Sequence, residues 1–282
     1  MSWKTLEAEA SKRAHEIRKQ TGLGLAPIGD MVQFFESLGH DIAVIEISDE
    51  DSHGMTASDP VSGAVFTVVA TTKNPVRQRS TIAHELGHII FDEWHQDENG
   101  ADYASRNVSE KRADTFARHL LIPEEAIKDF FERNGCTDVS LRDFSALVQA
   151  FQVSPMMAAI ATYNAGLISE DRKKGFGGYS TFMLAQLFGW ADQYRQLQQA
   201  STAKKAPQRL LQRAVSAYQQ GVLSAQSIAN LRGLPVAAVL ADFKEAGIEP
   251  VELADAGDTN FEPEESLTDS ELDELFGGID GQ

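Results

Sequence analysis

Two histidines stand four residues apart, with a glutamate after the first, in the largely apolar stretch from Thr81 to Ile90. On a helix, positions i and i+4 lie on one face, so His84 and His88 can direct imidazole nitrogens at a single metal ion. Glu85 follows His84 and can reach a water molecule held by that metal. This H-E-x-x-H pattern is the signature of zinc peptidases, and it requires a helix, a third ligand and a cleft around it.

A catalytic zinc site takes three protein ligands and leaves the fourth position to water, so the sequence has to supply one more donor. Asp92, Glu93 and His95 follow the motif closely. They belong to the same helix or to its immediate exit, and they cannot easily turn back to the metal. Glu110 begins a separate helical pattern that can pack alongside and present its carboxylate directly. We therefore predict that Glu110 completes the zinc site with the two histidines.

Asp114 lies four residues after Glu110 and so on the same helical face. Its carboxylate can accept a hydrogen bond from the outer nitrogen of a zinc-bound histidine and fix the tautomer of that ring. Glu85 is then the predicted general base, which takes a proton from the metal-activated water and returns it to the amine of the cleaved peptide. The predicted chemistry is peptide hydrolysis.

A single cysteine, Cys136, rules out an intrachain disulfide and a thiol-rich zinc site. We expect this thiol to be packed or idle, and we expect His53, His95 and His119 to be surface residues. No apolar run is long enough to span a membrane, and residues 1–19 lack the apolar core of an export signal. These features indicate a cytoplasmic protein without a membrane partner.

The net charge of −17 is concentrated at the C-terminal end of the 282-residue chain. Residues 245–282 carry thirteen Asp and Glu and no Lys or Arg, which leaves −4 for the rest. We predict that residues 251–282 form a disordered acidic tail. Its apolar cluster near Leu272 would be either a solvated part of that tail or a partner-binding helix.

Hydrophobic periodicity predicts an α+β fold for the first part of the chain. We expect helices over 2–20 and 27–39, strands over 40–47 and 63–70, and a helix from Pro75 that carries the two histidines. The polar segment 48–60 is interpreted as a loop or short strand at the rim of the cleft. Ser109 is the predicted N-cap of the helix that carries Glu110.

Residues 139–168 have the pattern of two short helices joined by a turn, which resembles a helix-turn-helix, and a weaker copy follows at 225–246. The second helix of the first pair, residues 154–165, contains no Lys or Arg. Recognition of DNA needs such side chains, so we expect packing or protein binding there and disfavour direct contact with nucleic acid.

We predict four segments. Residues 1–168 form a zinc metallopeptidase domain that includes the helix-turn-helix-like part, and residues 169–179 form a glycine-rich linker. Residues 180–250 form a C-terminal helical region, and residues 251–282 form the acidic tail. Within the third segment we expect one helix over about 180–199. Length and composition are compatible with one sizeable core and a smaller second module.

Two blocks, Arg77 to His88 and Glu110 to Pro123, carry a family resemblance. Through them the chain resembles the ImmA/IrrE metallopeptidases over about residues 10–168. The resemblance implies a small zincin-like catalytic domain of reduced thermolysin type. It also implies a cytoplasmic, zinc-dependent endopeptidase that cleaves a helix-turn-helix transcriptional repressor and so derepresses stress or mobile-element genes. Ser80, where the family usually has a large aromatic residue, and Asp92, where a histidine is common, depart from the pattern.

Two other functions compete with the peptidase. In the first, the zinc fold is a scaffold and the protein is a non-proteolytic binding module, such as one half of a toxin–antitoxin-type pair. In the second, it is a zinc-stabilised DNA-binding regulator, which the absence of basic residues from 154–165 disfavours. The sequence does not indicate an oligomeric state.

Overall fold

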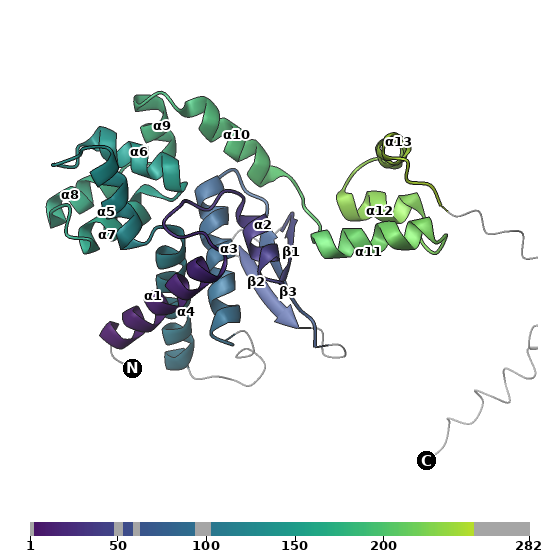
Figure 1. Ribbon diagram of the computed structural model, residues 1–282, viewed down its shortest axis with the longest axis horizontal. Coiled ribbons are helices and arrows are strands. Elements are labelled where there is room, and N and C mark those ends of the chain that lie inside the picture. Colours follow the sequence, from purple (N-terminus) through teal and green to yellow (C-terminus); the bar gives the residue numbers. More distant parts are fainter. Residues whose placement is uncertain (1–2, 48–52, 59–62, 94–102, 251–282) are drawn as a thin grey trace, which may run out of the picture.

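The computed structural model describes residues 3–47, 53–58, 63–93 and 103–250 (Figure 1). Its N-terminal part combines a small mixed sheet with helices, as the predicted α+β fold class requires. The strands are β1 (Asp41–Ile45), β2 (Gly54–Ser58) and β3 (Val65–Ala70). The helices are α1 (Trp3–Gln20), α2 (Met31–Ser37), α3 (Pro75–Ile90) and α4 (Tyr103–Leu121). The fold class is thus confirmed.

The sheet has the order β1-β3-β2, with β1 parallel and β2 antiparallel to β3. Val44 lies beside Val69 in the register, and Thr56 lies beside Thr67. Val44, Thr67 and Val69 are buried, whereas Phe66, on the other face, is 41 % exposed. The alternation is typical of a sheet with one covered face. β2 occupies the segment for which the sequence allowed a loop or a short strand.

Helix α3 packs on β2 and β3, and α4 packs along α3. Asn74 caps α3 by accepting the N–H of Arg77, and Pro75 occupies the first turn, where a proline removes no helical hydrogen bond. Gly87 lets the two helices approach closely, because a Cβ added there would lie 3.0 Å from the Cα of Ala113. The contact places the face of α3 that carries the histidines against α4.

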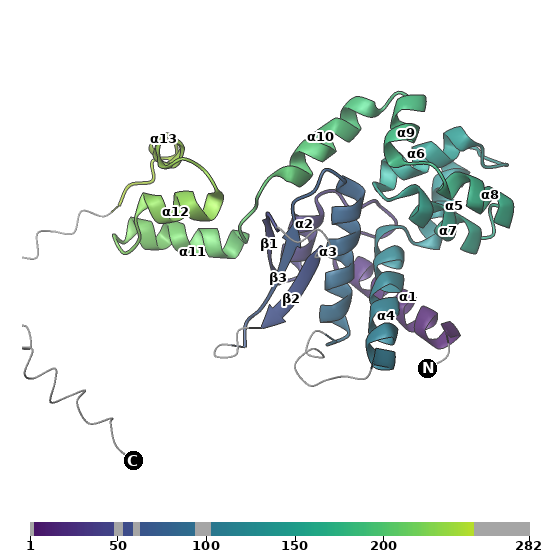
Figure 2. The same ribbon diagram turned by 180° about the vertical axis from the view of Figure 1, so that it is seen from behind.

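The next helices form a group beside α1 and α4 (Figures 1 and 2) and share one hydrophobic core with the N-terminal part. They are α5 (Glu124–Arg133), α6 (Leu141–Phe151), α7 (Pro155–Asn164), α8 (Glu170–Gly177) and α9 (Thr181–Leu187). The helix-turn-helix-like pair is α6 and α7, which meet at 110°. Residue Gln152 ends α6 in the left-handed conformation, with a φ of 51°.

Two expectations for the middle of the chain differ from the structure. The stretch interpreted as a linker, 169–179, contains α8, which packs against α7. The helix expected over 180–199 is divided into α9 and α10 (Ala191–Thr202). Gly189 lies at the break with a φ of 80°, which a helix cannot accommodate. The predicted domain boundaries stay predictions.

Helix α10 leads to a segment that closes the outer edge of the sheet. Val44 N–H donates to the carbonyl oxygen of Lys205 at 2.8 Å, and Lys205 N–H donates back to Val44 at 2.9 Å. Ser201 donates its hydroxyl to the carbonyl oxygen of Thr72 at 2.7 Å, and Arg209 pairs with Asp41 at 2.8 Å. Residues 201–209 therefore hold the C-terminal helices to β1.

Beyond this segment lie α11 (Gln208–Gln219), α12 (Ala225–Arg232) and α13 (Val236–Ala246), set to one side of the sheet (Figures 1 and 2). They have a separate small core built around Tyr218, Ile228, Val239 and Phe243. The acidic segment 251–282 lies outside the described residues. Within the described part of the chain, no single helix is long and apolar enough to cross a membrane, although α6 and α7 would pass such a test as a bent pair.

Candidate metal centre

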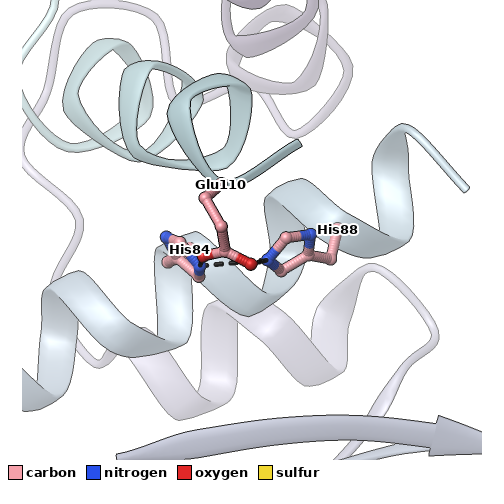
Figure 3. A group of neighbouring side chains, drawn as sticks. All are labelled: His84, His88 and Glu110. Atoms are coloured by element: carbon pink, nitrogen blue, oxygen red, sulfur yellow. Dashed lines mark hydrogen bonds and ion pairs between the residues drawn. The ribbon is translucent and has the colours of Figure 1, made fainter. Parts of the chain in front are cut away.

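Three side chains from α3 and α4 converge on one point (Figure 3). The Nε2 atoms of His84 and His88 lie 3.0 Å apart. Glu110 reaches between them from α4, with Oε2 at 3.1 Å from His84 Nε2 and Oε1 at 3.5 Å from His88 Nε2. The structure therefore brings together the three residues that the sequence predicted as ligands.

The spacing of these atoms fits a zinc ion. Tetrahedral zinc with bonds of about 2.0–2.1 Å keeps its ligand atoms about 3.3 Å apart. The three distances, 3.0, 3.1 and 3.5 Å, lie close to this value. The side chain of Glu110 is 52 % exposed, so the centre is open to solvent on the side of α4. Two imidazoles and one carboxylate with an open position are the donor set of a catalytic zinc site.

Of the other candidates for the third ligand, the two that the structure describes, Asp92 and Glu93, are not part of this cluster. Glu93 accepts a hydrogen bond from Ser109 at 3.0 Å and lies 3.4 Å from Arg112. Asp92 adopts a left-handed conformation with a φ of 55° just beyond α3, and it is absent from the groups of donor atoms that the described residues bring together. His95 lies outside the described residues.

Each histidine is held at its outer nitrogen. Asp114 lies 2.8 Å from Nδ1 of His84, as predicted for a carboxylate that fixes the tautomer. The hydroxyl of Ser109 lies 3.4 Å from Nδ1 of His88 and donates to Glu93. With a proton on Nδ1 of each ring, both contacts would orient Nε2 toward a cation shared by the two histidines.

Ser109 was predicted as the N-cap of its helix, and this prediction is wrong. Helix α4 begins at Tyr103, so Ser109 lies inside it and is buried. Its hydroxyl serves a tertiary contact with α3 instead of the helix end. Sequence reasoning therefore missed the residue that holds His88.

The electrostatics of the cluster favour a positive charge at its centre. Burial opposes protonation of His84, but the carboxylates of Asp114 and Glu110 outweigh it and raise the pKa of His84 to about 10. Burial and the neighbouring charge of His84 lower the pKa of His88. The cluster thus attracts one cation strongly and resists a second proton, which suits a metal ion shared by both rings.

Glu85 lies beside the cluster and is 7 % exposed. Burial raises the pKa of its carboxyl group, which makes it a stronger base than an exposed glutamate. Thr56 of β2 donates its hydroxyl to Glu85 Oε2 at 2.8 Å and lies 2.9 Å from the hydroxyl of Thr67. A Cβ on Gly54 would lie 2.9 Å from Glu85 Oε1. Strand β2 therefore fixes the predicted general base from one side.

The sequence predictions for the remaining histidines and the cysteine agree with the structure only in part. His119 is 6 % exposed and lies 2.7 Å from Glu7, so its prediction as a surface residue is wrong. His53 is partly exposed and contacts Arg77. The thiol of Cys136 donates to the carbonyl oxygen of Asp138 at 3.5 Å, and burial together with the neighbouring Asp143 carboxylate raises the pKa of the thiol, which disfavours the reactive thiolate.

Comparison with known families matches residues 35–163 to the peptidase M78 model, described as the IrrE N-terminal-like domain. This range begins in α2 and ends in α7, and it contains the histidine cluster, Glu85 and Asp114. Helix α1 and everything after α7 lie outside it. A search among curated proteins finds no match to the chain.

Proposed function

We infer from the membership of residues 35–163 in the ImmA/IrrE family of metallopeptidases that this chain is a zinc-dependent endopeptidase. The observation that carries the proposal is the convergence of His84 Nε2, His88 Nε2 and a Glu110 oxygen, with the donor atoms all within 4.8 Å of one another. A buried glutamate lies next to them. A scaffold that only needed metal for stability would have no use for this base beside an open position.

The roles of the side chains follow from their places. A zinc ion held by His84, His88 and Glu110 would polarise a peptide carbonyl and acidify a water molecule. Glu85 takes the proton of the attacking water and delivers it to the leaving amine. The raised pKa of Glu85 supports both steps, since a base that titrates closer to neutral pH also returns its proton readily. Thr56 keeps the carboxylate in place during the exchange.

The sheet supports a peptide substrate in extended form. β2 is the outer strand next to the metal cluster, and its outer edge pairs with no further strand among the described residues. The opposite edge, on β1, is occupied by Lys205. An extended segment of another protein can add to a free strand edge through main-chain hydrogen bonds. A substrate bound along β2 would pass close to Glu85.

The substrate we propose is a helix-turn-helix transcriptional repressor, whose cleavage derepresses stress or mobile-element genes in the cytoplasm. The support is the family resemblance of the two sequence blocks. Direct binding of this chain to DNA is disfavoured, because α7 has no Lys or Arg and buries Ala158, Ala159 and Ala161 in the core. The protein therefore acts on the regulator and not on the DNA.

The test is the substitution Glu85→Gln, which keeps the shape of the side chain and removes the base. We expect unchanged zinc content and a loss of cleavage of about a hundredfold or more. Glu125→Gln, on the exposed side of α5, is the matched control and should cleave like the wild type. Full biological activity of Glu85→Gln would contradict the peptidase proposal and favour a non-proteolytic binding module.

A further inference from the structure

A cavity of about 750 Å³ lies between α1, α4, α5 and α7, next to the metal centre. Asp114, which holds His84, is part of its wall, so cavity and metal centre are adjacent. We call it the Trp3–Glu124 cavity, after two residues of its lining. Its volume is in the range of pockets that bind ligands, which is about 300–1,000 Å³.

One part of the lining is apolar and exposed to water. Trp3 is 59 % exposed and Met156 is 50 % exposed, and both line the cavity with Met157 and Ile160. Large apolar side chains gathered around a hollow mark a site that binds another apolar group. The family match does not include Trp3, which belongs to α1.

The other part of the lining is acidic. Glu7, Asp114 and Glu124 face the cavity, and Arg118 is the one cation among the described residues that line it. Arg118 forms an ion pair with Glu7. Burial opposes ionisation of Glu7, but hydrogen bonds from Arg118 and His119 outweigh it and lower its pKa. The lining thus carries three carboxylates against one cation, and because Asp114 is also paired with His84, Glu124 supplies most of the uncompensated negative charge.

Two other occupants fit this wall poorly. Donor atoms of Glu7, His119 and Glu124 lie within 4.8 Å of one another, which is close enough for a metal ion. Glu7 and His119 already bind each other at 2.7 Å, however, and Glu7 also pairs with Arg118, so two of the three donors are occupied. The chain's own segment 251–282 is strongly acidic and would meet carboxylates of the same sign.

We propose that the Trp3–Glu124 cavity binds a segment of the protein substrate in which apolar residues alternate with lysine or arginine. The proposal rests on the peptidase function inferred above and adds the class of sequence that is chosen. Lysine and arginine lay their aliphatic stems on apolar surfaces such as Trp3 and Met156 while the charged end reaches a carboxylate. Glu124 lines the same cavity and supplies such a carboxylate.

The test measures binding without hydrolysis, in the full-length Glu85→Gln protein. The probes are a short fluorescein-labelled peptide of alternating leucine and arginine, and its counterpart with glutamate in place of arginine, followed by fluorescence anisotropy. We expect the arginine peptide to bind more tightly. Adding Glu124→Lys should weaken its binding by about tenfold, and raised salt should reduce the difference.

Glu125→Lys is the matched control, because it makes the same charge change in the first turn of α5 but lies outside the cavity. It should change the affinity by less than about twofold. Met156→Gln should weaken both peptides, since it removes part of the apolar wall. Equal binding of the two peptides, or equal effects of the two lysine substitutions, would overturn the proposal.

A cleavage assay with Glu85 intact distinguishes failure of the cavity proposal from failure of the proposed peptidase function. If Glu124→Lys cleaves the protein substrate with unchanged kcat/KM, the cavity does not select the substrate and the peptidase function stands. If the arginine peptide binds as predicted and no protein substrate is cleaved, the cavity assignment stands and the peptidase function fails.

Discussion

Replacing Gly54 by alanine should move the predicted general base, Glu85, without lowering the zinc content that we expect for the protein. An alanine Cβ at this position of β2 would come within 2.6 Å of Thr81 Cγ2 and 2.9 Å of Glu85 Oε1. Ordinary contact begins at 3.4 Å, so these atoms have to retreat by about 0.8 Å and 0.5 Å. Thr81 is β-branched and stiff on a helix, so its clash is relieved by a small shift of β2. The Glu85 carboxylate, which Thr56 of β2 holds by a hydrogen bond, is displaced by about 0.5 Å in the same movement.

The shift of the Glu85 carboxylate determines how far kcat should fall. Misplacing a catalytic group by about 1 Å costs about a hundredfold in rate, so a shift of about half that distance should lower kcat about tenfold. KM should change little, because the contacts that bind substrate in the ground state are not removed. The added methyl group should also destabilise the fold by about 1–3 kcal/mol through overpacking.

The assay compares purified full-length proteins for zinc content, thermal unfolding and cleavage of the protein substrate at saturation. Gly175→Ala is the control, because nothing lies within 4 Å of a Cβ added there and alanine favours a helix. It should cleave like the wild type. Wild-type kcat in Gly54→Ala with full zinc content would refute the reasoning, and so would a loss of zinc in proportion to activity.

Three further substitutions test the rest of the site and the fold. Glu110→Ala should lower the zinc-to-protein ratio after dialysis, and an unchanged ratio would place the third ligand elsewhere. Ser109→Ala should weaken zinc affinity about tenfold in a chelator competition, since the outer nitrogen of His88 loses its partner; an unchanged affinity would show that Ser109 does not position the ring. Glu7→Gln should cost about 1 kcal/mol in the free energy of unfolding at neutral pH, allowing for partial exposure of the ion pair with Arg118. The pKa of Glu7 is lowered from 4.5, so this contribution is present above that pH and is lost as pH falls through the folded pKa. A constant difference across acid pH would contradict the ion-pair assignment.

The cluster of His84, His88 and Glu110 could be predicted from the sequence because helical periodicity is a local property. Two residues at i and i+4 share a face wherever the helix lies, and a second helix is the simplest way to bring a carboxylate to them. The contact of Thr56 with Glu85 could not be predicted in this way. It depends on the register of β2 against β3 and on the packing of α3 across both, which are tertiary properties.

The stretch 169–179 shows why a linker could not be predicted from glycine content alone. Its glycines suggested a linker, but Gly177 is in helix α8, and a Cβ added there would lie 3.1 Å from Met156. Gly177 therefore lies in the contact between α8 and α7 and not in a free linker. Composition alone does not distinguish a glycine that makes the backbone flexible from a glycine that has no side chain because a neighbouring helix lies close.

The closure of the β1 edge has a consequence for the order in which the protein is made. Val44 and Lys205 are 161 positions apart, so the hydrogen bonds between them form late and carry a high cost in chain entropy. A chain that folds as it leaves the ribosome has β1, β3, α3 and α4 available long before Lys205 emerges. The cluster of His84, His88 and Glu110 can therefore assemble while the neighbouring strand edge is still open, and the nascent protein passes through a stage in which the proposed metal site is formed but the β1 edge is not yet covered.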